Sequence, residues 1–206
     1  MGENDRGPEA TTPDRSRSIW LETTTGTDYD PLEGDVGVEV AVVGGGIAGL
    51  TTAFYLARAG RSVAVIERDR IVEAVTGHTT AKLTSLHGLV YDQLVDGFGA
   101  ELARLYGEAN EAAIEEVAAI ADDRDVDCDF DRAPAYTYTR SVDHRQAIHD
   151  EVRAAERLDL PASFVESAPL PVDVEAAVRF DDQAHFHPRK FQIGRASCRE
   201  RVCLYV

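Results

Sequence analysis

The sequence predicts an α/β fold that begins with a parallel βαβ unit. Three observations support this prediction: a β-branched run at 38–43, a glycine-rich turn with a helical pattern at 44–60, and a second apolar run at 62–67. A strand, a helix and a second strand in this order pair the two strands in parallel, because the helix carries the chain back to the starting edge. With 206 residues, the chain is long enough to bury a substantial core.

The remaining elements follow from periodicity and turn residues. Leu50, Ala53 and Phe54 fall at helical spacing, and Gly60 is placed to end that helix. The small, hydroxyl-rich residues of 76–88 predict a loop with at most one helical turn. Beyond it we expect a helical region to about residue 121 with one apolar face, formed by Phe98, Leu102, Leu105, Ala109, Ala113 and Val117. A strand at 125–131 with Val126, Cys128 and Phe130 inward and a strand at 135–139 follow. The last elements expected are a helix at 143–158 capped by Ser141 or Asp143, a strand at 174–180 and a turn at His187-Pro188.

The charge balance limits the classes of partner. The chain has 37 acidic and 21 basic side chains, a net charge of −16, and Lys82 and Lys190 are its two lysines. This excess of acid argues against nucleic-acid and membrane partners, and it is typical of a salt-adapted, halophilic protein, although an ordinary acidic protein is an alternative. No run of 18 apolar residues predicts a transmembrane helix. Cys128 is the single cysteine before residue 193, which favours a reducing, cytoplasmic setting.

The glycine-rich turn matches a dinucleotide-binding fingerprint. Gly44, Gly46 and Gly49 have G-x-G-x-x-G spacing between a strand and a helix, and Glu67 ends the second strand 18 residues after Gly49. The first glycine permits the tight turn, the second lets the backbone approach a pyrophosphate, and the third allows close packing of helix on strand. Glu67 is placed to accept hydrogen bonds from the adenosine ribose hydroxyls.

The N-terminus of that helix is the expected phosphate site. Free N–H groups and the positive end of the helix dipole favour an anion there. The residues expected to bind the cofactor in this way are Gly44, Gly45, Gly46, Ile47, Ala48 and Gly49. Arg68, directly after Glu67, has two interpretations: it binds a 2′-phosphate, or it is a solvated arginine at a strand end.

Longer segments indicate which dinucleotide is bound. “VVGGGIAGLTTAFYLARAG” at 42–60 resembles the N-terminal FAD motif of the D-amino-acid oxidase-like (DAO) flavoprotein superfamily. “SIW” at 18–20, “TGHTTAKLTSLHGLVYDQL” at 76–94 and “DQAHFHPRKF” at 182–191 are similar to a subgroup of FAD-dependent oxidoreductases that often carry a C-terminal Rieske iron–sulfur domain. The resemblance covers roughly residues 18–192 and implies FAD as the cofactor.

The resemblance also implies a role for the loop after the second strand. In that superfamily the loop approaches the ribityl chain and the flavin ring, and Thr79, Thr80, Ala81 and Lys82 occupy it in this sequence. Hydroxyl and N–H groups can bind the pyrophosphate or ribityl oxygens, and a lysine near the flavin can stabilise charge on the reduced ring. A surface salt bridge is the alternative role for Lys82.

The histidines have structural and functional interpretations. His78 and His87 lie in or beside the loop and are candidates for proton carriers or for hydrogen-bonded structural histidines. His185 and His187 would share one face of a strand, but no third ligand is identifiable, so we predict no metal site. A calcium loop at 125–131 is excluded because Phe130 and Tyr136 stand where such a loop requires glycine and glutamate.

We expect four segments along the chain. These are a disordered polar tail at 1–17, an FAD-binding Rossmann-like portion with inserted helices at 18–125, the start of an α+β substrate or cap domain at 126–192, and a non-native tail at 193–206. The last expectation arises because “IGRASCRERV” at 193–202 resembles one reading frame of a short-read sequencing adapter. In the resembled superfamily further strands follow, so we expect a truncated fold.

Three functional hypotheses remain open. The first is an FAD-dependent oxidoreductase that transfers hydride from a small amine or amino acid to flavin and passes electrons to a partner or to oxygen. The second is an NAD(P)-dependent dehydrogenase that uses the same fingerprint. The third is an incomplete fragment without catalysis. A Rieske domain is not expected within this chain, because Cys198 and Cys203 have no neighbouring histidine, and no residue is assigned a catalytic role.

Overall fold

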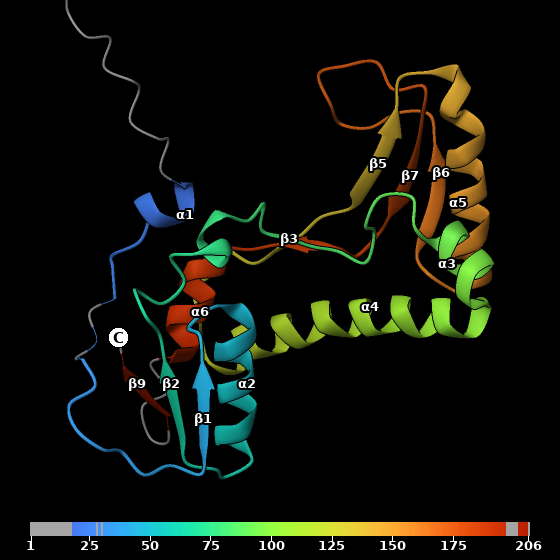
Figure 1. The fold of residues 1–206 in the computed structure, drawn as a ribbon. Coiled ribbons are helices and arrows are strands. Elements are labelled where there is room, and N and C mark those ends of the chain that lie inside the picture. The colour runs from blue at the N-terminus through green and yellow to red at the C-terminus, as the bar shows by residue number, and fades with distance from the viewer. Residues whose placement is uncertain (1–17, 28, 30, 197–201, 206) are drawn as a thin grey trace, which may run out of the picture. The chain divides into compact units, whose positions relative to one another are not determined.

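The computed structural model describes residues 18–196, without 28 and 30, together with 202–205 (Figure 1). The contacts divide the chain into two compact units, one formed by the chain up to Thr79 with the segment after Ser197, the other by Thr80–Ser197. The predicted tail at 1–17 lies outside the described residues, as do residues 197–201 and 206 of the second predicted tail. The predicted boundary at residue 125 between cofactor and substrate portions stays a prediction.

The first unit contains the predicted βαβ unit. Strands β1 and β2 pair in parallel with Val40 opposite Val63, and the described sheet has the order β1-β2-β9 (Figure 1). Its elements are α1 (Ile19–Glu22), β1 (Val40–Val43), α2 (Ile47–Arg58), β2 (Val63–Ile66), the 3₁₀ turn η1 (Val75–His78) and β9 (Val202–Tyr205).

Helix α2 forms where the apolar spacing predicts it. Leu50, Ala53 and Phe54 are its buried side chains, and β2 is buried at Val63 and Val65. Gly60 follows the helix with φ +84°, a left-handed conformation that glycine adopts without the steric cost of a Cβ. The βαβ prediction is therefore confirmed.

Strand β9 lies within the segment predicted to be non-native. Its backbone pairs in parallel with β2, with Val202 opposite Val63. A short apolar segment can add to the edge of a sheet whatever its origin, because backbone N–H and C=O groups form the hydrogen-bond ladder. The non-native origin of 193–206 stays a prediction.

The second unit combines helices with antiparallel sheets. The described strands form the orders β5-β7-β6 and β3-β8-β4. Its elements are β3 (Lys82–Leu83), α3 (Tyr91–Phe98), α4 (Ala100–Asp123), β4 (Asp131–Arg132), β5 (Ala135–Thr139), the 3₁₀ turn η2 (Val142–His144), α5 (Arg145–Arg157), β6 (Ala162–Val165), β7 (Ala176–Phe180), β8 (Ala184–His185) and α6 (Pro188–Ala196).

The core of this unit lies between α3, α5 and the β5-β7-β6 sheet. Tyr91 stacks on Phe180 with ring centroids 5.8 Å apart, and both side chains are fully buried. The equally buried carboxylate of Glu151 accepts hydrogen bonds from the N–H groups of Val90, Tyr91 and Asp92 at 2.8, 2.9 and 3.1 Å. Glu151 of α5 thus caps the N-terminus of α3, where N–H groups have no partner within the helix.

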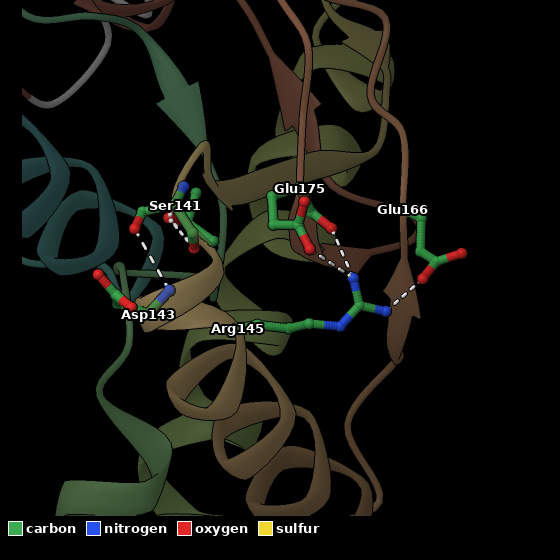
Figure 2. Close-up of polar contacts among 6 residues, drawn as sticks. Ser141, Asp143, Arg145, Glu166 and Glu175 are labelled. Atoms are coloured by element: carbon green, nitrogen blue, oxygen red, sulfur yellow. Dashed lines mark hydrogen bonds and ion pairs between the residues drawn. The ribbon is translucent and has the colours of Figure 1, made fainter.

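Arg145 fixes the segment between β6 and β7. Its guanidinium donates to the backbone oxygen of Glu175 at 2.9 Å, to the Glu175 carboxylate at 3.0 Å and to Glu166 (Figure 2). Ser141, one of the two predicted caps, caps the preceding η2 turn by accepting from the Asp143 N–H at 3.3 Å (Figure 2). The helix α5 itself starts after His144, which makes no side-chain capping bond. One arginine therefore closes both ends of the 167–174 loop.

The apolar face predicted for the long helical region is wrong in its orientation. Gly99, with φ +83°, divides the region into α3 and α4. Phe98, Leu102 and Leu105 are 67%, 56% and 54% exposed, whereas the side chains that α4 buries are Ala103, Gly107, Ile114 and Ile120. Periodicity identifies residues that share a face, but packing decides which face is buried.

No described helix is long and apolar enough to cross a membrane.

The strand predicted at 125–131 is also wrong. Asp125 and Asp129 have φ of 51° and 52°, and these left-handed residues interrupt an extended backbone, so a strand forms only at β4. Cys128 nevertheless points inward and is 1% exposed, as predicted. Strand β6, which the sequence pattern missed, completes the sheet beside β7.

Candidate cofactor site

The glycine loop connects β1 to α2 in a tight turn. The Gly44 N–H donates to the Ile66 carbonyl at 2.8 Å, which extends the β1-β2 ladder by one bond. Gly44 then adopts φ +106°, and Gly46 is the N-cap residue of α2. The turn prediction for Gly44 is thus confirmed in its backbone geometry.

Gly45 and Gly49 stand where no side chain fits. A Cβ on Gly49 would lie 1.9 Å from the Gly44 carbonyl oxygen, and one on Gly45 would lie 2.6 Å from Cγ2 of Ile71. Helix α2 therefore begins close against the end of β1, as the spacing of the motif predicts. This contact fixes the direction in which the first N–H groups of α2 point.

Glu67 accepts three backbone hydrogen bonds beside the loop. Its Oε2 accepts from the Gly45 N–H at 2.7 Å, and its Oε1 accepts from Arg68 and Asp69 at 2.8 and 3.1 Å. The bond from Gly45, followed by that from Asp69, lowers the pKa of Glu67 from its ordinary value, so the carboxylate is ionised at neutral pH. A carboxylate has about four acceptor positions, which leaves capacity for a ribose hydroxyl.

Thr76 is a site residue that sequence reasoning missed. Its hydroxyl oxygen accepts from the Ile47 N–H, the first of α2, at 3.0 Å, and a Cβ on Gly46 would lie 3.4 Å from the same oxygen. Thr76 comes from η1, and its side chain is 9% exposed. The only sequence signal was its position in the hydroxyl-rich segment, which also contains the selected Thr79 and Thr80.

The N–H groups of Ala48 and Gly49 at the start of α2 are available to an anion. The Leu50 N–H bonds to the Gly46 carbonyl at 3.0 Å, so the ladder of the helix begins there. Ala48 and Gly49 precede that bond, and their N–H groups have no carbonyl within the helix to bond to. These donors and the glycine turn at 44–49 fit the pyrophosphate of an adenine dinucleotide, and the Glu67 carboxylate fits its ribose.

Arg68 lies outside this arrangement of donors. Its side chain is 90% exposed and pairs with Asp69 at 3.0 Å. An exposed pair of this kind contributes little to stability. The geometry matches the solvated arginine, the second of its two interpretations.

The predicted flavin loop contains the boundary between the two compact units. Thr79 closes the first unit, and its carbonyl accepts from the Trp20 indole N–H at 2.7 Å. Thr80, Ala81 and Lys82 belong to the second unit, where Ala81 is buried with φ +59° and Lys82 is exposed and opposite His185 in the β3-β8 pair. Contact of these four residues with a flavin stays a prediction.

The histidines have structural partners. His78 Nδ1 lies 2.9 Å from the Ala74 carbonyl oxygen, and His87 Nδ1 lies 2.6 Å from the Tyr106 hydroxyl. His187 is 4% exposed, and its Nδ1 accepts from the Lys190 N–H at 3.2 Å, which caps α6 directly before Pro188. Burial lowers the pKa of His187, in keeping with a neutral ring that accepts this bond. Among the described residues, no group of three or more potential metal ligands occurs.

The parallel βαβ unit, its glycine loop and Glu67 define a dinucleotide-binding α/β protein. Residues 39–201 match the family described as “DAO: FAD dependent oxidoreductase”. The chain belongs to this family of FAD-dependent oxidoreductases, and FAD is therefore its cofactor. This confirms the predicted family and cofactor, and no observation favours the nicotinamide alternative.

Similar proteins agree with this assignment. The chain is 36% identical over 174 residues to the putative Rieske 2Fe-2S iron-sulfur protein YhfW of Bacillus subtilis, covering 84% of this chain and 34% of the relative. It is 26% identical over 175 residues to gamma-glutamylputrescine oxidoreductase of Escherichia coli, covering 82% of this chain and 41% of the relative. The chain thus spans less than half the length of these relatives.

Solved structures show the same fold. L-amino acid deaminase from Proteus vulgaris aligns with a TM-score of 0.65 at 16% identity, covering 85% of this chain and 41% of that one. Glycine oxidase from Bacillus cereus aligns with a TM-score of 0.61 at 18% identity, covering 82% and 46% of the two chains. The predicted fold class, a Rossmann-like FAD-binding fold, is thereby confirmed.

Proposed function

We propose that the protein oxidises a small amine or amino acid, with FAD as the acceptor of hydride from the carbon beside the substrate nitrogen. The observation that carries this proposal is the α2 N-terminus beside Glu67, which offers N–H donors suited to a pyrophosphate and an ionised acceptor suited to a ribose. The substrate class is supported by similar proteins, whose names specify gamma-glutamylputrescine, glycine and L-amino acids.

Each part of FAD is assigned to the residues that are expected to bind it. The N–H groups of Ala48 and Gly49 hold the pyrophosphate, and Glu67 accepts from the adenosine ribose hydroxyls. Thr79 to Lys82 approach the ribityl chain and the flavin, where the cation of Lys82 stabilises negative charge on the reduced ring. Arg68 stays in solvent.

The electron acceptor is proposed to be oxygen or a separate Rieske-type centre. The name of the relative YhfW, a putative Rieske 2Fe-2S protein, supports the second alternative. A Rieske cluster requires two cysteines and two histidines, and residues 18–192 contain Cys128 alone. Reoxidation of the reduced protein in air and under argon, with and without an iron–sulfur partner, distinguishes the two acceptors.

Cofactor content tests the central proposal. The full gene product is purified, the cofactor is released by heat, and it is identified by absorbance and mass. We expect FAD at a stoichiometry near one, and reduction of the bound flavin by primary or secondary amines under argon. Protein that contains no flavin, or a flavin that no amine or amino acid reduces, contradicts the proposal.

We further propose that the 206-residue chain by itself binds FAD weakly and aggregates. Val43 at the end of β1 and Val75 in η1 are 85% and 86% exposed, and exposed apolar side chains favour association. A soluble monomer of this chain that melts cooperatively with stoichiometric FAD would refute this proposal.

Salt adaptation is proposed from the charge of −16. Repulsion among exposed carboxylates weakens as salt screens them. We therefore expect the melting temperature to rise between low salt and roughly molar KCl. A melting temperature that stays constant or falls over this range favours an ordinary acidic protein.

A further inference from the structure

Helix α1 packs on the turn that precedes the flavin loop. The Trp20 indole N–H of α1 donates to the Thr79 carbonyl at 2.7 Å, a contact between residues 59 positions apart. Leu21 lies on the same turn, because a Cβ on Gly77 would come within 3.0 Å of Leu21 Cδ2. Ser18 fixes the start of α1 by accepting from the Trp20 N–H at 3.3 Å. This short helix therefore contacts η1 and the residue that follows it.

The η1 turn makes a second contact, with the N-terminus of α2. Thr76 Oγ1 accepts from the Ile47 N–H at 3.0 Å, beside Gly46. The turn thus contacts both α1 and the helix end that is proposed to bind pyrophosphate. All of these residues belong to the first compact unit. A displacement of η1 from α1 would also displace the Thr76 hydroxyl from α2.

We propose that Trp20 is a positioning residue for FAD: its indole holds the Thr79 carbonyl and so keeps the η1 turn fixed before the cofactor arrives. The inference rests on the proposed role of this site in FAD binding. A segment that is already ordered loses less conformational entropy when its ligand binds. Trp20 lies outside residues 39–201, which match the family, so the family match assigns it no role.

The substitution Trp20→Phe tests this role. Phenylalanine keeps an aromatic ring on α1 but removes the N–H donor to Thr79. We expect the dissociation constant for FAD to rise by about five- to tenfold, since a tenfold change corresponds to about 1.4 kcal/mol. The measurement is a titration of the full-length apoprotein with FAD, followed by flavin fluorescence.

Ile19→Ser is the matched control. Ile19 is on the same helix and is 61% exposed. We expect this variant to bind FAD as the wild type does. Equal FAD affinity in Trp20→Phe and the wild type overturns the inference, as does an equal loss of affinity in both variants, because the effect would then belong to α1 as a whole.

Hydrogen exchange in the wild type provides a second test that does not depend on a variant folding. The Gly77 N–H donates to the Ala74 carbonyl at 3.1 Å within η1. If the turn is fixed in advance, this amide is protected in the apoprotein, and FAD changes its exchange rate less than tenfold. Protection that arises only after FAD is added overturns the inference. A wild type that binds no FAD contradicts the proposed function instead, so the two failures are distinguishable.

Discussion

The substitution Gly49→Ala should damage the cofactor site more than its small size suggests. The added Cβ would lie 1.9 Å from the Gly44 carbonyl oxygen, about 1.5 Å closer than the 3.4 Å at which ordinary contact begins. This atom belongs to the backbone of the tight turn, so α2 must move away from β1. Because the contact is with backbone, we expect an overpacking cost at the upper end of the usual range, about 3 kcal/mol. This exceeds the gain of at most about 1 kcal/mol in helix propensity.

Gly97→Ala provides the matched comparison. Gly97 lies in α3, and nothing stands within 4 Å of its added Cβ. We expect this variant to unfold at a slightly higher urea concentration than the wild type, because alanine favours a helix by up to about 1 kcal/mol. We expect Gly49→Ala to unfold at a lower concentration and to be purified with less FAD. The argument is refuted if Gly49→Ala retains wild-type FAD content and unfolds no earlier than Gly97→Ala.

Three further predictions concern the carboxylates of Glu67 and Glu151 and the imidazole of His187. Glu67→Gln should weaken FAD binding about tenfold in a fluorescence titration of the apoprotein, because one amide oxygen replaces an ionised acceptor of three N–H groups; an unchanged affinity contradicts this. Glu151→Gln should lower the free energy of unfolding by about 2–3 kcal/mol in urea, because the buried cap of α3 loses acceptor capacity; a wild-type midpoint contradicts this. Burial lowers the pKa of His187 below its unfolded value, so its contribution to stability is complete above about pH 6.5 and decreases as the pH falls toward the folded pKa. His187→Asn keeps a capping acceptor and should make unfolding less pH-dependent between about pH 7.5 and 5.5; equal slopes in the two proteins contradict this.

The parts that the sequence predicted correctly depend on local rules. Gly44 has a positive φ, the position of Gly49 leaves no room for a Cβ, and Gly60 ends a helix. Each of these glycines therefore predicts a local feature of the βαβ unit. The β-branched runs on either side supply the buried strands. Such signals need only a few neighbouring residues, which is why this unit could be predicted from one sequence.

The wrong predictions concern features that depend on packing between distant parts of the chain. The predicted helical spacing runs across Gly99, where the helix is interrupted, so Phe98 belongs to α3 and Leu102 and Leu105 to α4. All three are exposed, whereas Ile114 and Ile120 are buried. Glu151 capping α3 could not be predicted either, because donor and acceptor are about sixty positions apart. A sequence pattern reports which residues share a surface, whereas the partner of that surface depends on the assembled fold.

The polar groups of the cofactor site illustrate the same distinction. The glycine motif predicts where N–H groups become free, but the structure shows which of them already have a partner. Glu67 accepts from Gly45 and Thr76 accepts from Ile47, so in the proposed binding mode the pyrophosphate contacts the N–H groups of Ala48 and Gly49. The Thr76 hydroxyl can still donate its own hydrogen to a phosphate oxygen, because a hydroxyl both accepts and donates. In this proposal the anion-binding end of α2 depends on η1 as well as on the glycines, and the proposed effect of Trp20 on FAD affinity follows from its contact with Thr79.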